Sequence, residues 1–407
     1  MFKQYKGLRK ELYVLFFGRV MTNLGSMIWP MLTLILNKKL GMNANEVANC
    51  LLVFSLLALP VSLLGGKLSD KLNKKNIIVI CDLFSVFFYL ICGFIPLSFL
   101  SIIFIAIAAL LQTSEWPAYD ALVSDFTLPS DRQRAYSLSY FGANLGLMLS
   151  PTIGGLLFNN YLNIAFIING LAILSSTCLI FFLIKNVNRE ESEDDVNEYE
   201  KDLDNNTNSF KYIFTNKVLV FYLIACVLYE LAYHQFSFLV PLEMGRVFGD
   251  NGSIIYGTLS SMNCVTVVLL TAFLTRILNR VLDINKCMLG CLSVIIGLII
   301  FGTLSKYPFM NYVAVVVFTI GEIISTLGQK PFISKRIPAN YRGRINSIIN
   351  VIGNVTISIM TKVVGNLYDT KGNMLSWGFI YIIGLISIIA YLLLRSADKK
   401  EYPALYK

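Results

Sequence analysis

Charged side chains inside long apolar stretches are the residues of this sequence that could do chemistry. An ionised group costs free energy in an apolar surrounding, so each needs a partner, a wet cavity or a proton. A buried carboxyl group binds a proton more readily than one in water, because burial penalises its charged form. Such groups can carry protons or recognise a cation. The candidates are Arg19, Glu115, Asp120, Glu230, His234 and Glu322.

Three of these candidates are expected to carry the coupling chemistry: Glu115, Glu230 and Glu322 lie deep in their stretches without an obvious basic partner. Arg19 and Asp120 lie at similar depth and could form an ion pair, with either a mechanistic or a purely structural role. His234 is the only histidine of the chain and follows Glu230 by four residues, so the two share a helix face. Packing or hydrogen bonding is the alternative role of this histidine.

Aromatic residues lie near the same positions. An aromatic face attracts cations, so these rings could help to bind a lipophilic cation. Packing in the core or against lipid is the alternative. The sequence contains no Walker loop, metal-ligand cluster or nucleophile triad, and we therefore expect neither an enzyme nor a cofactor or metal. The rings belong to Tyr119, Tyr229, Tyr233, Phe236 and Phe238.

The elements that must position these residues are membrane-spanning helices. Of the 407 residues, 56% are hydrophobic and 14% are charged, which is too apolar for a soluble globular protein. Apolar runs long enough to cross a bilayer recur along the whole chain. The sequence predicts an all-α integral membrane protein with spans at 12–36, 46–68, 76–96, 98–126, 133–160, 162–184, 217–245, 252–278, 286–304, 308–334, 342–367 and 373–395.

The basic residues indicate the orientation of these spans. With both termini placed inside, 27 of the 34 Lys and Arg residues fall on the cytoplasmic side and five on the outer side, while Arg19 and Lys362 lie within spans. This asymmetry follows the positive-inside rule. It also explains the net charge of +9 without nucleic-acid binding. The eight cysteines fall in or beside apolar runs and are expected to be packing thiols.

A polar segment divides the chain into two halves. Residues 185–211 contain nine acidic residues and six asparagines, with little to bury, and are expected to be a solvated cytoplasmic linker. The predicted organisation is a six-helix bundle at 1–184, a linker at 185–214, a second six-helix bundle at 215–395 and a tail at 396–407. A faint repeat supports two pseudo-symmetric halves: Arg132, Asn144 and Gly155 recur 210 residues later as Arg342, Asn354 and Gly365.

The short charged stretch at 65–75 resembles the signature loop between helices 2 and 3 of the major facilitator superfamily. The matching residues are Gly66, Leu68, Asp70, Lys71, Lys74 and Lys75. Asn73 stands where that family usually has glycine, a mild departure because asparagine tolerates the left-handed backbone. The resemblance implies two six-helix halves around a central cavity, with substrate bound near the midplane and lined by spans 1, 4, 7 and 10.

The resemblance also implies a gating role for this stretch. Asp70 would lie against the amino terminus of span 11, where the helix dipole favours a carboxylate. Its partners would be Lys74 and Asp125, and the cluster would hold the halves together when the cavity faces outward. Lys71 and Lys75 are expected only to set topology. The alternative is a solvated turn without a gating role.

Span 5 resembles the antiporter motif of the superfamily's drug exporters. The matching residues are Gly142, Gly146, Pro151, Gly154 and Gly155, and Ser150 replaces the usual glycine before the proline. The alternative is an ordinary tight helix contact, since small residues let helix backbones approach closely. The end of span 4 is also similar to drug-exporter-like members. A family arginine earlier in span 4 has no match near Ile105, which weakens the analogy of coupling.

We therefore expect a secondary transporter that couples protons to the export of small amphipathic or cationic compounds by alternating access. One alternative is an importer of a sugar, peptide or other metabolite on the same fold; another is a membrane sensor or scaffold that does not transport. The expected partners are a small-molecule substrate, protons and the lipid bilayer, without nucleic acid, and the protein is expected to be a monomer. The expected location is a bacterial cell membrane, with both termini cytoplasmic.

Overall fold

The computed structural model describes residues 7–127, 132–184, 213–337 and 342–406, and these residues form helices and no strand. The helices that precede residues 185–212 in the chain are α1 (Lys10–Gly25), α2 (Ile28–Leu34), the π-helix η2 (Ile35–Lys39), α3 (Ala44–Lys71), α4 (Lys74–Phe94), α5 (Phe99–Asp125), α6 (Arg132–Leu147), α7 (Ser150–Leu157) and α8 (Leu162–Leu183). Those after it are α10 (Lys217–Tyr233), α11 (Gln235–Phe248), η5 (Gly249–Asn251), α12 (Gly252–Ile277), η6 (Leu278–Arg280), α13 (Asp283–Thr303), α14 (Pro308–Ser334), α15 (Arg342–Lys371), α16 (Asn373–Glu401) and η8 (Pro403–Tyr406).

These helices account for twelve membrane crossings. Ten stretches of the described residues are long and apolar enough to cross a membrane. One of them, Lys217–Arg280, is 64 residues long and holds two crossings, α10–α11 and α12. The pair α6–α7, at about 1.5 Å per residue, is long enough for one more. The prediction of an all-α, twelve-helix integral membrane protein is confirmed.

The chain divides into two compact units by its contacts. The first unit comprises residues 1–43, 53–190 and 244–268, and the second comprises 44–52, 191–243 and 269–407. By chain order alone, residues 44–52 would belong to the first unit and residues 244–268 to the second, the reverse of their assignment by contacts. The expected linker at 185–214 lies almost wholly outside the described residues.

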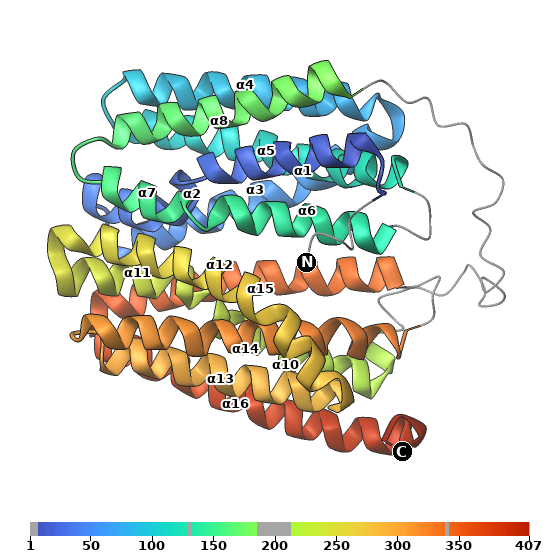
Figure 1. Cartoon of the computed structure of the whole chain (residues 1–407). Helices are drawn as coiled ribbons and strands as arrows, with labels where there is room; N and C mark the ends of the chain where they lie inside the picture. The colour runs from blue at the N-terminus through green and yellow to red at the C-terminus, as the bar shows by residue number, and fades with distance from the viewer. Residues whose placement is uncertain (1–6, 128–131, 185–212, 338–341, 407) are drawn as a thin grey trace. The chain divides into compact units, whose positions relative to one another are not determined.

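The first unit is built from helices that pack around a common apolar core. Helix α1 packs against α6 and α8, and α4 packs against α5 and α8 (Figure 1). The core draws buried side chains from α1, α4, α5, α6 and α8. They include Leu12, Leu15, Ile78, Leu122, Leu138 and Ile180.

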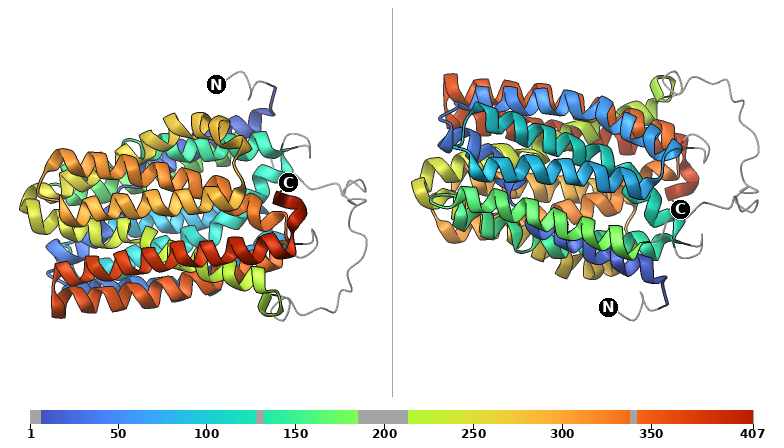
Figure 2. Two further views of the ribbon diagram at one scale, coloured as in Figure 1. Left: turned by 90° about the horizontal axis from the view of Figure 1, so that it is seen from below. Right: turned by 90° about the horizontal axis from the view of Figure 1, so that it is seen from above.

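The second unit is built around the antiparallel pair α13 and α14. These two helices lie side by side along much of their length (Figure 2), and α16 packs against both α10 and α13. Glycines explain the close approach of the pair. A Cβ atom built on Gly290 of α13 would lie 2.2 Å from Ser325 Oγ, and one built on Gly321 of α14 would lie 2.6 Å from Gly290 O. Small residues at such crossings let the backbones meet.

Several predicted spans are broken rather than continuous. The span predicted at 133–160 breaks between α6 and α7, because Pro151 has no N–H to continue the hydrogen-bond ladder. The span predicted at 12–36 breaks between α1 and α2, where the N–H of Met27 bonds to Gly25 O at 2.7 Å. The span predicted at 217–245 breaks at His234, which ends α10. The last two breaks were not predicted from the sequence.

A carboxylate caps the start of α3. Asp369, near the end of α15 in the second unit, accepts hydrogen bonds from the backbone N–H groups of Ala44 at 3.0 Å and Asn45 at 2.7 Å. These groups belong to the first turn of a helix, which has no internal acceptors for its N–H groups. The negative charge also complements the positive end of the helix dipole.

Candidate functional site

Two clusters of ionisable side chains lie between the packed helices, one in each unit. In the second unit, Glu230 of α10 and Glu322 of α14 are close enough for their charges to interact. Tyr233 is hydrogen-bonded to Glu322, and His234 Nε2 lies 3.9 Å from Glu230 Oε2. The side chains of His234 and Glu230 are 44% and 35% exposed, so neither is sealed in the core.

The break in the helix at His234 positions this cluster. The N–H of His234 still bonds to Glu230 O at 2.9 Å, and the N–H of Ser237 bonds to His234 O at 3.1 Å. The chain thus turns once at the level of the two glutamates before α11 continues. Interrupted helices are common where a membrane protein binds substrate or ions.

An aromatic wall flanks the two glutamates. The rings of Tyr229 and Tyr233 stack with centroids 6.0 Å apart, Tyr233 stacks on Phe318 at 5.3 Å, and Phe318 stacks on Phe236 at 5.0 Å. Tyr233 therefore links the stacked rings to Glu322, to which it is hydrogen-bonded. Phe238, another expected ring, is buried in the core, as are Tyr229 and Phe318, so Tyr233 and Phe236 are the partly exposed rings of the wall. A carboxylate pair beside stacked rings can hold a proton or an organic cation.

In the first unit, Arg19 of α1 lies against aromatic rings. Its guanidinium is 4.8 Å from the centroid of Trp116 and 4.4 Å from that of Tyr119. The Tyr119 hydroxyl donates to Leu15 O, which ties α5 to α1. Asp120 is exposed, and it interacts with Arg19 through its charge. The expected partners thus lie near each other, with the arginine seated on the rings.

Glu115, which was expected to have no basic partner, has another carboxyl group as its partner. It is hydrogen-bonded to Asp82 of α4, and the two side chains are 6% and 3% exposed. Asp82 Oδ2 also accepts a hydrogen bond from the Thr177 hydroxyl of α8 at 2.6 Å. The positive charge of Arg19 interacts favourably with the carboxyl groups of both Asp82 and Glu115.

Sequence reasoning missed Asp82, although the signal was present. Asp82 interrupts an apolar run as plainly as Glu115 does. It was overlooked because the family resemblance directs attention to spans 1, 4, 7 and 10, and Asp82 lies on the third span. Glu243, which is fully buried and accepts a hydrogen bond from Ser305 at 2.7 Å, was missed as well.

The charged stretch at 65–75 is mostly helical. Helix α3 continues to Lys71 and leaves only Leu72 and Asn73 as the turn. Asn73 has an extended backbone (φ −64°, ψ 116°), and its side chain caps α4 by accepting from Asn76 N, so it does not need the left-handed conformation. Gly66 has open space around it. The side chains of Asp70 and Lys71 lie outside the described part of the chain.

The structure brings Lys74 and Asp125 together. The ammonium group of Lys74, the first residue of α4, donates to Asp125, the last residue of α5. Its neighbour Lys75 was expected only to set the topology. In the structure it also donates hydrogen bonds to Phe181 O at 2.7 Å and Ile184 O at 2.6 Å. A positive charge there satisfies the carbonyl groups at the end of α8.

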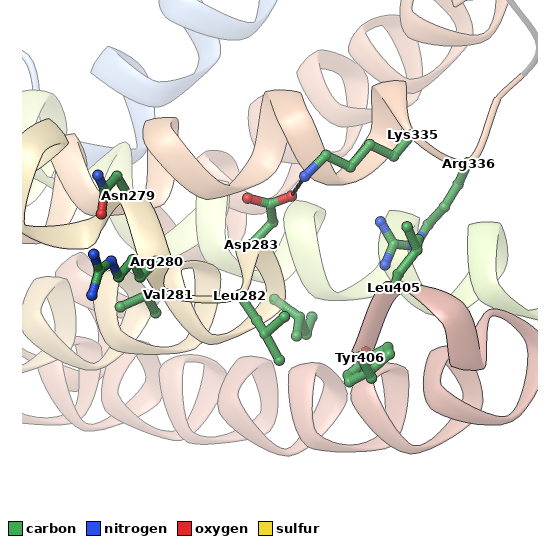
Figure 3. A pocket seen from close by; sticks show the side chains of 10 residues that line it. Asn279, Arg280, Val281, Leu282, Asp283, Lys335, Arg336, Leu405 and Tyr406 are labelled. Atoms are coloured by element: carbon green, nitrogen blue, oxygen red, sulfur yellow. Dashed lines mark hydrogen bonds and ion pairs between the residues drawn. The ribbon is translucent and has the colours of Figure 1, made fainter.

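The second unit carries the corresponding ion pair with its charges reversed. Asp283 is the first residue of α13 and pairs at 2.6 Å with Lys335, which directly follows α14 (Figure 3). Lys286 lies 3.2 Å from the same carboxylate. The pair borders a pocket of about 200 Å³ that Arg336 and Tyr406 also line. Helices α4 and α13 each have 21 residues, so Lys74 and Asp283 hold equivalent positions.

We expect reversal of the first pair to be tolerated. Lys74→Asp alone places two carboxylates together and should lower the free energy of unfolding by about 1–3 kcal/mol, the usual loss for a hydrogen bond to a charged group. Adding Asp125→Lys should restore most of the stability, because the second unit already uses this order. Thermal unfolding of both proteins in detergent measures the effect; a double variant as unstable as the single one would contradict it.

The glycines of the antiporter-like motif are contact points between helices. A Cβ atom on Gly146 would lie 2.5 Å from Val20 O, one on Gly154 would lie 2.9 Å from Met27 Cβ, and Gly142 faces Phe16. Gly155 faces α12, where a Cβ atom would lie 2.5 Å from Ser253 O. Pro151 O lies 2.3 Å from the Cβ position of Gly257. The motif therefore lets α6 and α7 approach their neighbours closely.

Twelve membrane-spanning helices with interrupted segments and intramembrane carboxylates are typical of a membrane transporter. The sequence profile of the Major Facilitator Superfamily matches residues 15–361. The chain belongs to this family.

Curated relatives are transporters of bacteria. The chain is 22% identical over 342 residues to a Na(+), Li(+), K(+)/H(+) antiporter of Planococcus maritimus, covering 78% of this chain and 80% of the relative. It is 27% identical over 316 residues to the uncharacterized MFS-type transporter YqjV of Bacillus subtilis, covering 76% and 73%. It is 32% identical over 154 residues to the quinolone resistance protein NorA of Staphylococcus aureus, covering 36% and 38%.

Solved structures share the fold at low sequence identity. A peptide transporter named POT has a TM-score of 0.77 at 13% identity, covering 96% of this chain and 95% of its own. The nucleoside transporter NupG has a TM-score of 0.76 at 13% identity, covering 95% and 100%. At this identity the likeness concerns the fold alone.

Proposed function

We propose that the protein exports small amphipathic cations in exchange for protons by alternating access. The observation that carries this proposal is the cluster in the second unit, where Glu230 and Glu322 lie beside the aromatic wall of Tyr229, Tyr233, Phe318 and Phe236. The carboxylates supply negative charge, and the partly exposed rings of Tyr233 and Phe236 supply apolar, cation-attracting faces.

Competition at this cluster explains exchange. A proton neutralises a carboxylate, and a bound organic cation stabilises the charged form of the same group. Proton and substrate therefore exclude each other. A protein that alternates its access between the two sides of the membrane then carries one in each direction.

The relatives support this reading. One relative is named an antiporter of Na(+), Li(+) and K(+) against H(+), and another is named a quinolone resistance protein. The proposal combines the two properties in these names, namely exchange against protons and resistance to a drug. The antiporter-like glycines of α6 and α7 fit the same class.

The remaining sequence expectations belong to this proposal. Asp70 and the Lys74–Asp125 pair would gate the cytoplasmic side, and Lys71 would help to set the topology there. Arg19, Asp120 and His234 would bind substrate or position the carboxylates. Both termini would lie in the cytoplasm, 1–184 and 215–395 would each supply six membrane-spanning helices, and the protein would work as a monomer in the cell membrane.

Transport into inside-out vesicles tests the proposal. The purified protein is reconstituted with known orientation, a proton gradient is imposed, and accumulation of ethidium or tetraphenylphosphonium is followed. The proposal requires that the gradient drives the cation toward the former outer side and that the cation in turn releases protons. Driven movement in the opposite direction would identify an importer, and no movement of either cation under a gradient would refute export of this substrate class.

A further inference from the structure

The first unit contains a second ionisable cluster that the proposed export does not use. Asp82 of α4, Glu115 of α5 and Thr177 of α8 meet in its interior, with exposed fractions of 3%, 6% and 2%. Asp82 lies eight residues into α4 and Glu115 ten residues before the end of α5, so both are about 12–15 Å from their helix ends. That depth is well inside a hydrocarbon core of about 30 Å.

The hydrogen bond between the two carboxyl groups requires a proton. A carboxylate only accepts hydrogen bonds, so two carboxyl groups can bond to each other only when one of them is protonated. The charge of Arg19 offsets one negative charge of the pair. One more positive charge then neutralises the pair, and a proton or a monovalent cation supplies it equally well; Asp120, which also interacts with Arg19, is exposed and lies outside this balance.

One oxygen of the cluster is left without a partner. Glu115 Oε2 is buried and accepts no hydrogen bond from an N–H or hydroxyl donor of the described residues. An oxygen of a buried carboxyl group in this state is costly unless something binds it. It belongs to the carboxyl group that faces Asp82, so its need can be met by a cation held between the two.

Thr177 can supply a third oxygen ligand. Its hydroxyl oxygen lies 2.6 Å from Asp82 Oδ2 and 2.9 Å from Ile173 O. A hydroxyl has one hydrogen, so only one of these oxygens can accept it. When it donates to Ile173 O, the lone pairs of the Thr177 oxygen are free to face a cation beside the carboxylates.

We propose that Asp82, Glu115 and Thr177 form a site for one monovalent cation, either a proton or a small alkali ion such as Na⁺ or Li⁺. Hard cations prefer such oxygen ligands. When Na⁺ enters, it binds both carboxylates and the bridging proton leaves to water, so the charge of the site is unchanged. The described residues contain no group of three or more His, Cys, Asp and Glu side chains that could hold a metal ion, which disfavours a tightly bound divalent or transition metal.

The second unit indicates that the acids are not required for packing. Cys291 holds in α13 the position that Asp82 holds in α4, and its thiol donates to Ser387 of α16 at 3.5 Å, as Thr177 meets Asp82. Ile324 holds in α14 the position that Glu115 holds in α5, counted from the first residue of two 27-residue helices. The corresponding helix pair of the second unit thus packs with neutral side chains at these two positions, and the charges in the first unit need another reason.

Proton release on adding alkali ions tests the site. The purified full-length protein is held in weakly buffered detergent solution with a pH-indicator dye, and NaCl or LiCl is compared with choline chloride at equal ionic strength. We expect saturable release approaching one proton per protein, since cation binding displaces the proton, and a rise in the thermal midpoint with Na⁺ or Li⁺ alone. Asp82→Asn and Glu115→Gln should lose both signals, and Thr177→Val should weaken them while Thr177→Ser keeps them.

Two further variants keep the test decisive. Glu322→Gln lies in the second unit and should retain the full Na⁺ signal, so loss of organic-cation export can be separated from loss of this site. The double variant Asp82→Cys, Glu115→Ile reproduces the neutral chemistry of the second unit; it should fold and show no proton release. Wild type that responds to Na⁺ and Li⁺ no more than to choline would overturn the proposal, as would a full response in folded Asp82→Asn or in the double variant.

Discussion

Glu322→Gln and Glu230→Gln should each abolish proton-driven accumulation of the organic cation, reducing it to the level of vesicles without protein. The amide keeps the shape of the side chain but cannot take up or release a proton. Downhill movement of the cation should survive in at least one variant, because a neutral residue no longer needs a proton to reset. Both activities are measured in the same reconstituted vesicles, with and without an imposed gradient.

The pH dependence gives this prediction a second readout. In wild type, binding of the cation should weaken as the pH falls, because protons compete for Glu230 and Glu322. The responsible Gln variant should bind more weakly and with little pH dependence. Asp250→Asn, which changes an exposed carboxylate in η5, is the matched control and should behave as wild type. Uphill transport with normal pH dependence in both variants would place coupling elsewhere, with Asp120 and His234 the next residues to test.

Asp398→Asn should destabilise the protein by about 3–5 kcal/mol, the cost of leaving a buried charge without its partner. Arg336 donates to both oxygens of Asp398 from Nε and Nη2, and their side chains are 4% and 0% exposed. The guanidinium also lies 3.5 Å over the ring of Phe332 and donates to Phe332 O at 2.7 Å. After the substitution it would remain buried with no counter-charge.

The neighbouring lysine supplies the control for this prediction. Lys335, which is 53% exposed, pairs with Asp283, so Lys335→Met should cost less than about 1 kcal/mol. Arg336→Met combined with Asp398→Leu should recover much of the loss, since a well-packed apolar pair can replace a buried ion pair. Thermal unfolding in detergent ranks the variants. An Asp398→Asn protein as stable as Lys335→Met would show that the pair contributes little.

The Arg336–Asp398 contact also anchors the end of the chain. The Tyr406 hydroxyl of η8 donates to Asp398 Oδ2 at 2.5 Å. Burial, followed by this bond to a carboxylate, raises the pKa of Tyr406 above its usual value. The hydroxyl therefore remains a donor throughout the physiological range, and the contact between η8 and α16 does not titrate there.

Composition and the lengths of the apolar runs predicted the type and the length of the helices because the bilayer sets both. A run such as Ile77–Leu97 must be helical to satisfy its backbone in lipid. The break at Pro151 was readable because proline lacks a donor. The breaks at Met27 and His234 were not, since neither residue forbids a helix and the surrounding packing decides.

The clusters were predicted in part for a similar reason. An acid in an apolar run is visible in the sequence, and Glu230, Glu322 and Glu115 were found in that way. Which acids meet depends on how far apart α4 and α5 lie and how each is rotated, which no local pattern encodes. Asp82 and Glu115 are therefore a pair that only the packed helices reveal.

The reversed ion pairs have an evolutionary consequence. If the two units descend from one duplicated segment, Lys74 and Asp283 derive from one ancestral position, and each pairs with a residue of opposite charge at or next to the end of the following helix. No single substitution exchanges two signs, so the lineage passed through a protein with like charges or a neutral side chain at this contact. On that history the contact itself does not depend on which helix end carries the acid, since both orders occur in one folded chain.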